Sequence, residues 1–117
     1  MTDATGVSWS ADGKIVFATN AGGKWEIWQT DADGANLKQL TQNCAGNDSC
    51  RQPFVSPDGR YIVFQATRGG VQNIWRIDAD GANATQLTFS GGISPSFSPD
   101  GRVVIYMRWT SPATTLW

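Results

Sequence analysis

The cysteines and carboxylates are the residue types in this chain that could carry out chemistry or hold a metal ion. The sequence has two cysteines, ten Asp plus Glu and no histidine. Without histidine, neither a Ser-His-Asp triad nor a Cys-His pair can be assembled from this chain. The nucleophile pattern Gly-x-Ser-x-Gly is also absent, because the near match at residues 92–96 ends in Ser96. We therefore expect no enzymatic activity, no catalytic residues and no cofactor.

Cys44 and Cys50 are the only cysteines, and they lie six positions apart in a stretch that also carries glycine, asparagine and serine. A disulfide between them would contribute about 2 kcal/mol to the free energy of unfolding in the chain-entropy model. It would also imply a periplasmic or extracellular setting. Free thiols are the alternative. Two thiols without a histidine make at most half of a zinc site, so we expect no metal ion here.

Most of the carboxylates belong to two recurring turn motifs. They are Asp12, Asp58 and Asp100 in Ser-x-Asp-Gly, and Asp31, Asp33, Asp78 and Asp80 in Asp-Ala-Asp-Gly-Ala-Asn. In such turns Asp bonds nearby backbone and Gly tolerates a positive φ, so we expect these residues to shape the scaffold. A calcium loop of the EF-hand type requires glycine at its sixth place, whereas Gly34 stands fourth.

The turn motifs are parts of a longer repeat. Ile-Val-Phe, Gly-Gly, Ile-Trp, Asp-Ala-Asp-Gly-Ala-Asn and Gln-Leu-Thr, within residues 15–41, return 47 positions later in the same order. Ser-Pro-Asp-Gly-Arg, at residues 56–60, returns 42 positions later. The two intervals differ because the first repeat carries an insertion around Cys44 and Cys50. Repeats of this length are typical of solenoids and propellers.

Each repeat is predicted to form four short strands. Val, Ile, Phe, Tyr and Trp dominate the predicted strands, turn residues separate them, and no segment shows a sustained helical period. We therefore predict an all-β fold of about two and a half β-propeller blades, each a four-stranded antiparallel sheet, in an incomplete ring. The expected divisions are an N-terminal tail (1–6), repeat 1 with its Cys-bearing insertion (7–53), repeat 2 (54–95) and a truncated repeat 3 (96–117).

The order of the motifs resembles the WD-repeat-like propeller repeat of the TolB family over roughly residues 7–117. The resemblance implies a non-catalytic, periplasmic scaffold that binds protein, since TolB binds the peptidoglycan-associated lipoprotein. Similar repeats occur in the gating propellers of prolyl oligopeptidase-like serine peptidases, so a fragment of such a domain is an alternative. This chain departs from the family in having too few blades to close a ring.

A self-assembling propeller fragment is a further alternative. An internal blade buries both faces against its neighbours, so two and a half blades would expose apolar sheet faces larger than monomers usually tolerate. We expect these faces to associate with remaining propeller blades or with further copies of the chain.

The charge balance and hydropathy bear on other partners. Nine Lys plus Arg face ten Asp plus Glu, and the sequence pI is about 5.1, which gives no electrostatic footprint for nucleic acid. No run approaches the roughly 18 apolar residues of a membrane span, and the N-terminus lacks the pattern of a signal peptide. We expect a protein partner, no nucleic acid and no membrane insertion, with any export signal outside this chain.

A local function is expected where the repeat is broken. In a propeller, residues 43–51 should lie beside residues 20–24 and 68–70, on the face where loops recognise partners. Our candidates for polar contacts with a partner are Asn47, Asp48, Arg51 and Arg68, against the alternative that they are only solvated. Trp28, Trp75 and Trp117 recur and are expected in the core. Trp25 and Trp109 do not recur as tryptophan, which favours a surface contact.

Overall fold

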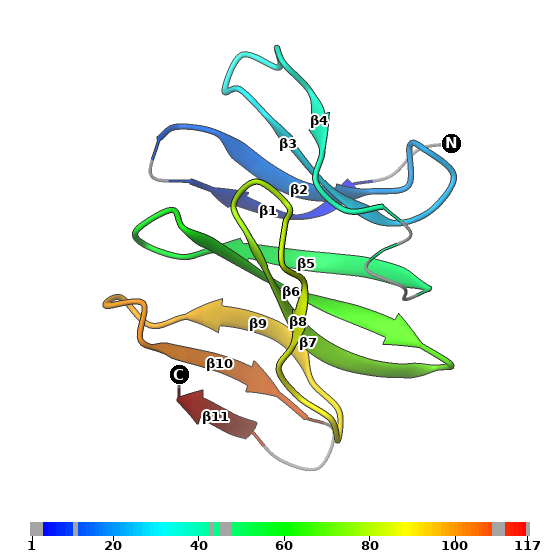
Figure 1. Cartoon of the computed structure of the whole chain (residues 1–117), viewed down its shortest axis with the longest axis vertical. Helices are drawn as coiled ribbons and strands as arrows, with labels where there is room; N and C mark the ends of the chain where they lie inside the picture. Colours follow the sequence, from blue (N-terminus) through cyan, green and yellow to red (C-terminus); the bar gives the residue numbers. More distant parts are fainter. Residues whose placement is uncertain (1–3, 11, 43, 45–47, 109–111, 117) are drawn as a thin grey trace.

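The computed structural model describes residues 4–10, 12–42, 44, 48–108 and 112–116, and these form three antiparallel sheets stacked in chain order (Figure 1). The first sheet contains β1 (Ala4–Trp9), β2 (Ile15–Thr19), β3 (Glu26–Thr30) and β4 (Lys38–Gln39). The second contains β5 (Ser49–Val55), β6 (Tyr61–Arg68), β7 (Val71–Asp78) and β8 (Thr85–Gln86), and the third contains β9 (Ile93–Phe97), β10 (Val103–Met107) and β11 (Pro112–Leu116). The predicted all-β architecture of propeller blades in an open array is confirmed. Within the described residues no helix is long and apolar enough to cross a membrane.

The recurring aspartates make the turns that their motifs predict. Ser56 Oγ donates to Asp58 Oδ1 at 2.6 Å, and the Arg60 amide donates to the same oxygen at 3.0 Å. The turn between β7 and β8 is closed by the Asn83 side chain, which donates to Asp78 Oδ2 at 2.6 Å. These hydrogen bonds fix the hairpins that join the strands of a sheet.

The first strand of each sheet begins earlier than its apolar residues predict, because a bulge interrupts the strand. The bulges contain residues with positive φ: Gly6 in β1, Gln52 in β5 and Ser94 in β9. The register shifts on either side of these positions, so the alternation of apolar residues is broken there. As a result β1 takes in residues 4–6 of the expected tail, and β5 takes in residues 49–53 of the expected first repeat.

Two apolar cores hold the three sheets together. Between the first and second sheets, Val16 and Ile27 pack with Ile62 and Phe64. Between the second and third sheets, Val63, Ile74 and Val104 form the other core. The second sheet therefore buries both of its faces, whereas the first and third sheets each bury one.

Candidate binding surface

The insertion between β4 and β5 is attached to the hairpin that joins β6 and β7. The Asp48 amide donates to the Thr67 carbonyl at 2.6 Å, and the Gly69 amide donates to Asp48 Oδ2 at 3.0 Å. Both the backbone and the side chain of Asp48 thus hold this segment in place. Asp48 lies next to Arg68, the residue before Gly69, and both are exposed.

Arg51 and Trp25 lie together on the adjoining part of the surface. The Arg51 guanidinium stands 4.1 Å from the centre of the Trp25 ring, a distance that gives a cation–π interaction. The Cys50 amide also donates to the Trp25 carbonyl at 3.0 Å. Trp25 is half-buried against the first core, while Arg51 is exposed. Trp25, which we expected to make a surface contact, lies between the first core and the Arg51 guanidinium.

The structure brings the predicted site residues to one region of the surface. Arg68 ends β6, and Asp48 is hydrogen-bonded to the amide of the next residue, Gly69. Arg51, three residues after Asp48, is stacked on Trp25. Asn47 and Trp109, which we also expected at the surface, lie outside the described residues. That these side chains contact a partner remains a prediction.

The expected disulfide joins Cys44 to Cys50, with the two Cα atoms 5.6 Å apart. Both cysteines are fully buried in the first core, next to Ala66 and Ile27. The bond fixes the start of the insertion to β5. Asp48 and Arg51 thus lie within two residues of a buried, disulfide-bonded cysteine.

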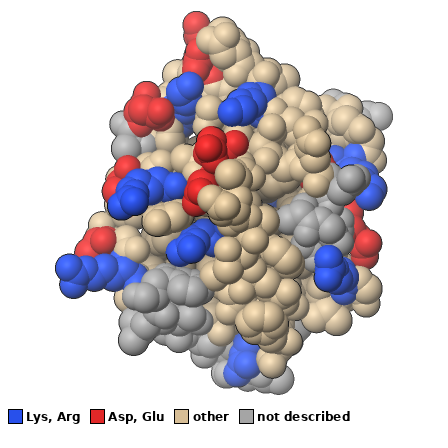
Figure 2. All heavy atoms as spheres, in the orientation of Figure 1, with Lys and Arg blue, Asp and Glu red and all other residues tan. Residues whose placement is uncertain are grey.

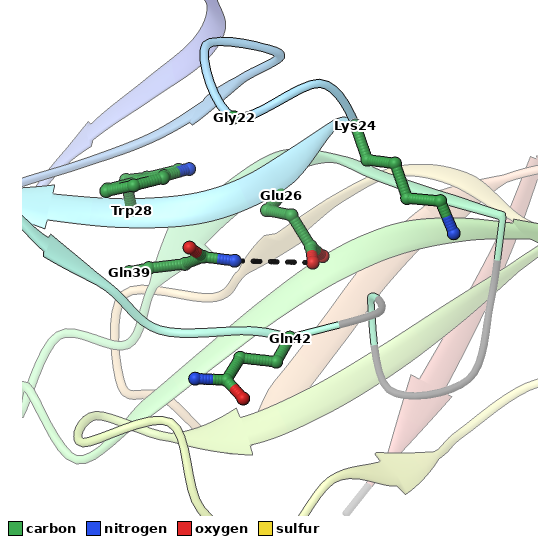
Figure 3. A pocket seen from close by; sticks show the side chains of 6 residues that line it. All are labelled: Gly22, Lys24, Glu26, Trp28, Gln39 and Gln42. Atoms are coloured by element: carbon green, nitrogen blue, oxygen red, sulfur yellow. Dashed lines mark hydrogen bonds between the residues drawn. The ribbon is translucent and has the colours of Figure 1, made fainter.

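Glu26 is a buried charged residue that the repeat analysis did not single out. Only 5% of it is exposed, and its carboxylate accepts hydrogen bonds from Thr41 Oγ1 at 2.9 Å and from Gln39 Nε2 at 3.4 Å (Figure 3). The equivalent position in the second sheet holds Asn73, which accepts from Thr88 Oγ1 at 2.9 Å. The signal that could have identified Glu26 is this alignment, in which a carboxylate replaces a neutral amide.

The Glu26 carboxylate and the two cysteine sulfurs lie within 4.8 Å of one another, and all three residues are buried. Glu26 also borders a recess of about 330 Å³, together with Gly22, Lys24, Trp28, Gln39 and Gln42. Lys24 points away from the Glu26 carboxylate (Figure 3). The Trp28 Nε1 donor is buried in this region without a hydrogen-bond partner among the described residues.

The charged side chains of both signs are interspersed. Figure 2 shows basic and acidic groups side by side over the visible face, where they form no continuous basic stripe. A nucleic-acid site usually presents Lys and Arg clustered on one face.

Comparison with known proteins gives one consistent family. The family model described as the TolB beta propeller domain matches residues 3–116. The chain is similar to the solved structure of putative TolB from Agrobacterium tumefaciens, with 29% identity and a TM-score of 0.77, over 91% of this chain and 38% of that one. It is also similar to TolB from Acinetobacter baumannii, with 26% identity and a TM-score of 0.75, over 96% of this chain and 28% of that one.

A TolB homologue of Chlorobaculum tepidum is 45% identical over 49 residues, which are 42% of this chain and 11% of that protein. The chain thus spans between a tenth and two fifths of the length of these relatives. The propeller domain of the trilobed protease from Pyrococcus furiosus, with 18% identity and a TM-score of 0.71, shares the fold alone.

Proposed function

This chain belongs to the family of TolB β-propeller domains, and from that premise we propose that it is a non-catalytic scaffold that binds another protein. The observation that supports the proposal is the attachment of the non-repeating insertion to the β6–β7 hairpin through Asp48. Arg51 and Arg68 are exposed on either side of that attachment. Charged groups held on a rigid scaffold favour specific recognition of a partner with complementary charge.

The residue inventory supports a role without catalysis. The chain has no histidine, and the turn aspartates are engaged in hydrogen bonds to their own hairpins. We propose a periplasmic or extracellular location, which the buried disulfide and the likeness to TolB proteins support. The proposal includes no nucleic acid, no membrane insertion and no cofactor.

The test is capture of a partner from an envelope extract of the source organism by immobilised protein, with surface variants for comparison. We expect Arg51→Ala together with Arg68→Ala to lose most of the captured partner, since both cations are removed while the attachment through Asp48 stays. Arg60→Ala, an exposed arginine in the turn between β5 and β6, is the matched control and should retain it. Equal recovery by the double variant and the control would exclude this surface.

A second candidate function is self-assembly, and the repeat itself favours it. Ile62, Phe64 and Ile77 pack the second sheet against the first, and their counterparts 47 positions earlier are Ile15, Phe17 and Thr30. Since Val16 and Ala18 of β2 lie in the first core, the alternate residues Ile15 and Phe17 belong to the outer face of the first sheet. The outer face of the first sheet therefore carries, at two of these three positions, the same residues with which the second sheet packs against the first.

The outer face of the third sheet has the complementary character. Ile105, 45% exposed, is the counterpart of Val63 at an interval of 42, and Val63 packs the second sheet against the third. Met107 on the same face is 53% exposed. We propose that the third sheet of one copy packs against the first sheet of a second copy. This head-to-tail contact would continue the stacking seen inside the chain.

Light scattering coupled to size-exclusion chromatography tests the assembly. We expect masses above 12.6 kDa that rise with protein concentration. Met107→Lys should reduce the mass to that of a monomer, whereas Val71→Lys, at an equally exposed site on the β6–β7 hairpin, should not. A stable monomer of 12.6 kDa at all concentrations would contradict self-assembly.

A further inference from the structure

We propose that Glu26, Cys44 and Cys50 form a binding site for a thiophilic divalent metal ion, such as Zn²⁺, when the disulfide is reduced. The site is distinct from the proposed partner-binding surface and does not depend on it. It arises from residues on three separate segments: β3, the insertion after β4, and β5. Two thiolates and a carboxylate are ligands that zinc accepts, and three protein ligands leave a fourth position open.

The geometry of the three groups is close to what a metal ion requires. Their ligand atoms lie within 4.8 Å of one another. Bond lengths of about 2.3 Å to sulfur and about 2.0–2.2 Å to oxygen place the ligand atoms of a tetrahedral zinc site about 3.4–3.8 Å apart. Small side-chain movements after reduction are therefore sufficient.

The burial of Glu26 is not accounted for by an ion pair. Within the described part of the chain no lysine or arginine forms an ion pair with it, and its partners are the neutral side chains of Thr41 and Gln39. A buried charge is costly unless it is paired or coordinates a metal. Asn73 makes the equivalent hydrogen bond with no charge at all, so the hydrogen bond to Thr41 does not explain a carboxylate.

We call the place where the chain passes from one sheet to the next a junction. The second junction, between the second and third sheets, has the same backbone hydrogen bond as the first junction but no ligand groups. The Gly92 amide donates to the Gln72 carbonyl at 2.9 Å, as the Cys50 amide donates to the carbonyl of Trp25. Gly92 is thus the counterpart of Cys50, and Gly91, which also has a positive φ, is the counterpart of Cys44 at an interval of 47.

The first junction therefore departs from the repeat at the three positions that hold Glu26, Cys44 and Cys50. All three departures introduce metal-ligating residues where the second junction has an amide and two glycines. The three residues meet in one buried place.

The chemistry makes the disulfide and the metal site mutually exclusive. A dithiol or phosphine reductant supplies two electrons, and two protons are taken up as the S–S bond breaks to give two thiols. The metal ion then binds both sulfurs as thiolates and releases those two protons. Of the three ligand residues, Glu26 borders the recess described above.

The experiment is a titration of the full chain with Co²⁺ under anaerobic conditions, after reduction by a phosphine and followed by competition with Zn²⁺. We expect one cobalt per chain and a thiolate-to-cobalt charge-transfer band, and no such band for the oxidised protein. Glu26→Gln should weaken binding at least about 100-fold, since even the loss of a group that only orients a ligand costs about 10–100-fold. Asp100→Asn, an exposed carboxylate in the turn between β9 and β10, should bind as the unaltered chain does.

Tryptophan fluorescence and circular dichroism of the reduced chain establish that it is folded. Glu26→Asn, which reproduces the residue of the second sheet, provides a second variant whose fold the repeat already accommodates. Absence of the charge-transfer band in the folded, reduced chain would overturn the proposal. So would unchanged affinity in both Glu26 variants, or a stoichiometry of two chains per metal ion.

Discussion

The first and second sheets are built from the same repeat, yet they stand in different surroundings. Phe17 and Phe64 are equivalent, but Phe64 is fully buried between two sheets and Phe17 is half-buried on an outer face. Gly34 and Gly81 occupy the same turn with φ of 88° and 94°. A Cβ at Gly81 would lie 2.3 Å from the Leu40 carbonyl oxygen, whereas one at Gly34 would meet nothing within 4 Å.

These pairs teach that the neighbouring sheet decides how much a repeated residue contributes to stability. The motif sets the backbone conformation in both copies. Only the second sheet has a neighbour on each side, so only there do the apolar residues of both faces pack in a core. Each matched pair can therefore be used to separate the contribution of the turn or strand from that of its surroundings.

Phe64→Ala against Phe17→Ala should give the largest difference. Removing a fully buried phenylalanine costs about 3–5 kcal/mol of unfolding free energy, because it leaves a cavity between the sheets. Phe17→Ala in the monomeric state should cost about 1 kcal/mol, since that ring already contacts solvent. Urea denaturation at low protein concentration measures both. Equal costs would mean that the outer face of the first sheet is covered.

Gly81→Ala against Gly34→Ala should give the next largest difference. Both alanines must adopt a positive φ, which costs about 1–2 kcal/mol. At Gly81 the new methyl group also meets the Leu40 backbone, and overpacking of this kind adds about 1–3 kcal/mol. The same denaturation experiment applies, and similar values for the two variants would show that the turn of the second sheet does not approach Leu40 as described.

Reduction of the Cys44–Cys50 bond should affect the first junction alone, because the second has glycines at the equivalent positions. The loop that the bond closes is short, so we expect a loss of about 2 kcal/mol. Denaturation with and without a metal-free reductant measures it. The double variant Cys44→Ser, Cys50→Ser should be insensitive to reductant; a response from it would point to some other effect of the reagent.

The sequence predicts the architecture well because the repeat carries it. Intervals of 47 and 42 identify the blades, and recurring Ser-x-Asp-Gly motifs identify the hairpins that the structure contains. The bulges escape prediction because three different residue types, Gly6, Gln52 and Ser94, adopt the same positive φ, and only glycine signals that conformation.

The surroundings of Glu26 are hidden from the sequence for a different reason. Glu26 and Cys50 are 24 positions apart and meet only because β5 starts beside β3, as the hydrogen bond from Cys50 to the Trp25 carbonyl shows. The same contact stacks Arg51 on Trp25, a pairing that no motif announces. Junctions between blades are tertiary features, so the repeat gives their positions but not the side chains that meet in them.

The smallest difference between the two sheets is expected for the pKa values of their turn aspartates, Asp12 and Asp58. The hydroxyl of Ser56 lowers the pKa of Asp58 below its ordinary value of 3.8, and Ser10 does the same for Asp12 in the first sheet. A depressed pKa in the folded state stabilises the protein above the unfolded value, and this contribution is lost as the pH falls below about 4. Both carboxylates are exposed to solvent, so the neighbouring sheet should have no influence on their pKa values.

Ser56→Ala tests this expectation. The pKa of Asp58 should rise toward 3.8, because its largest stabilising hydrogen bond is lost, while the pKa of Asp12 stays where it is. Carboxyl chemical shifts followed by NMR between about pH 2 and 6 measure both groups in one sample. Ser10→Ala should produce the reciprocal result with a shift of similar size. A clearly larger shift in the second sheet would show that its neighbours reach even the exposed turns, and the division between motif and surroundings would then fail.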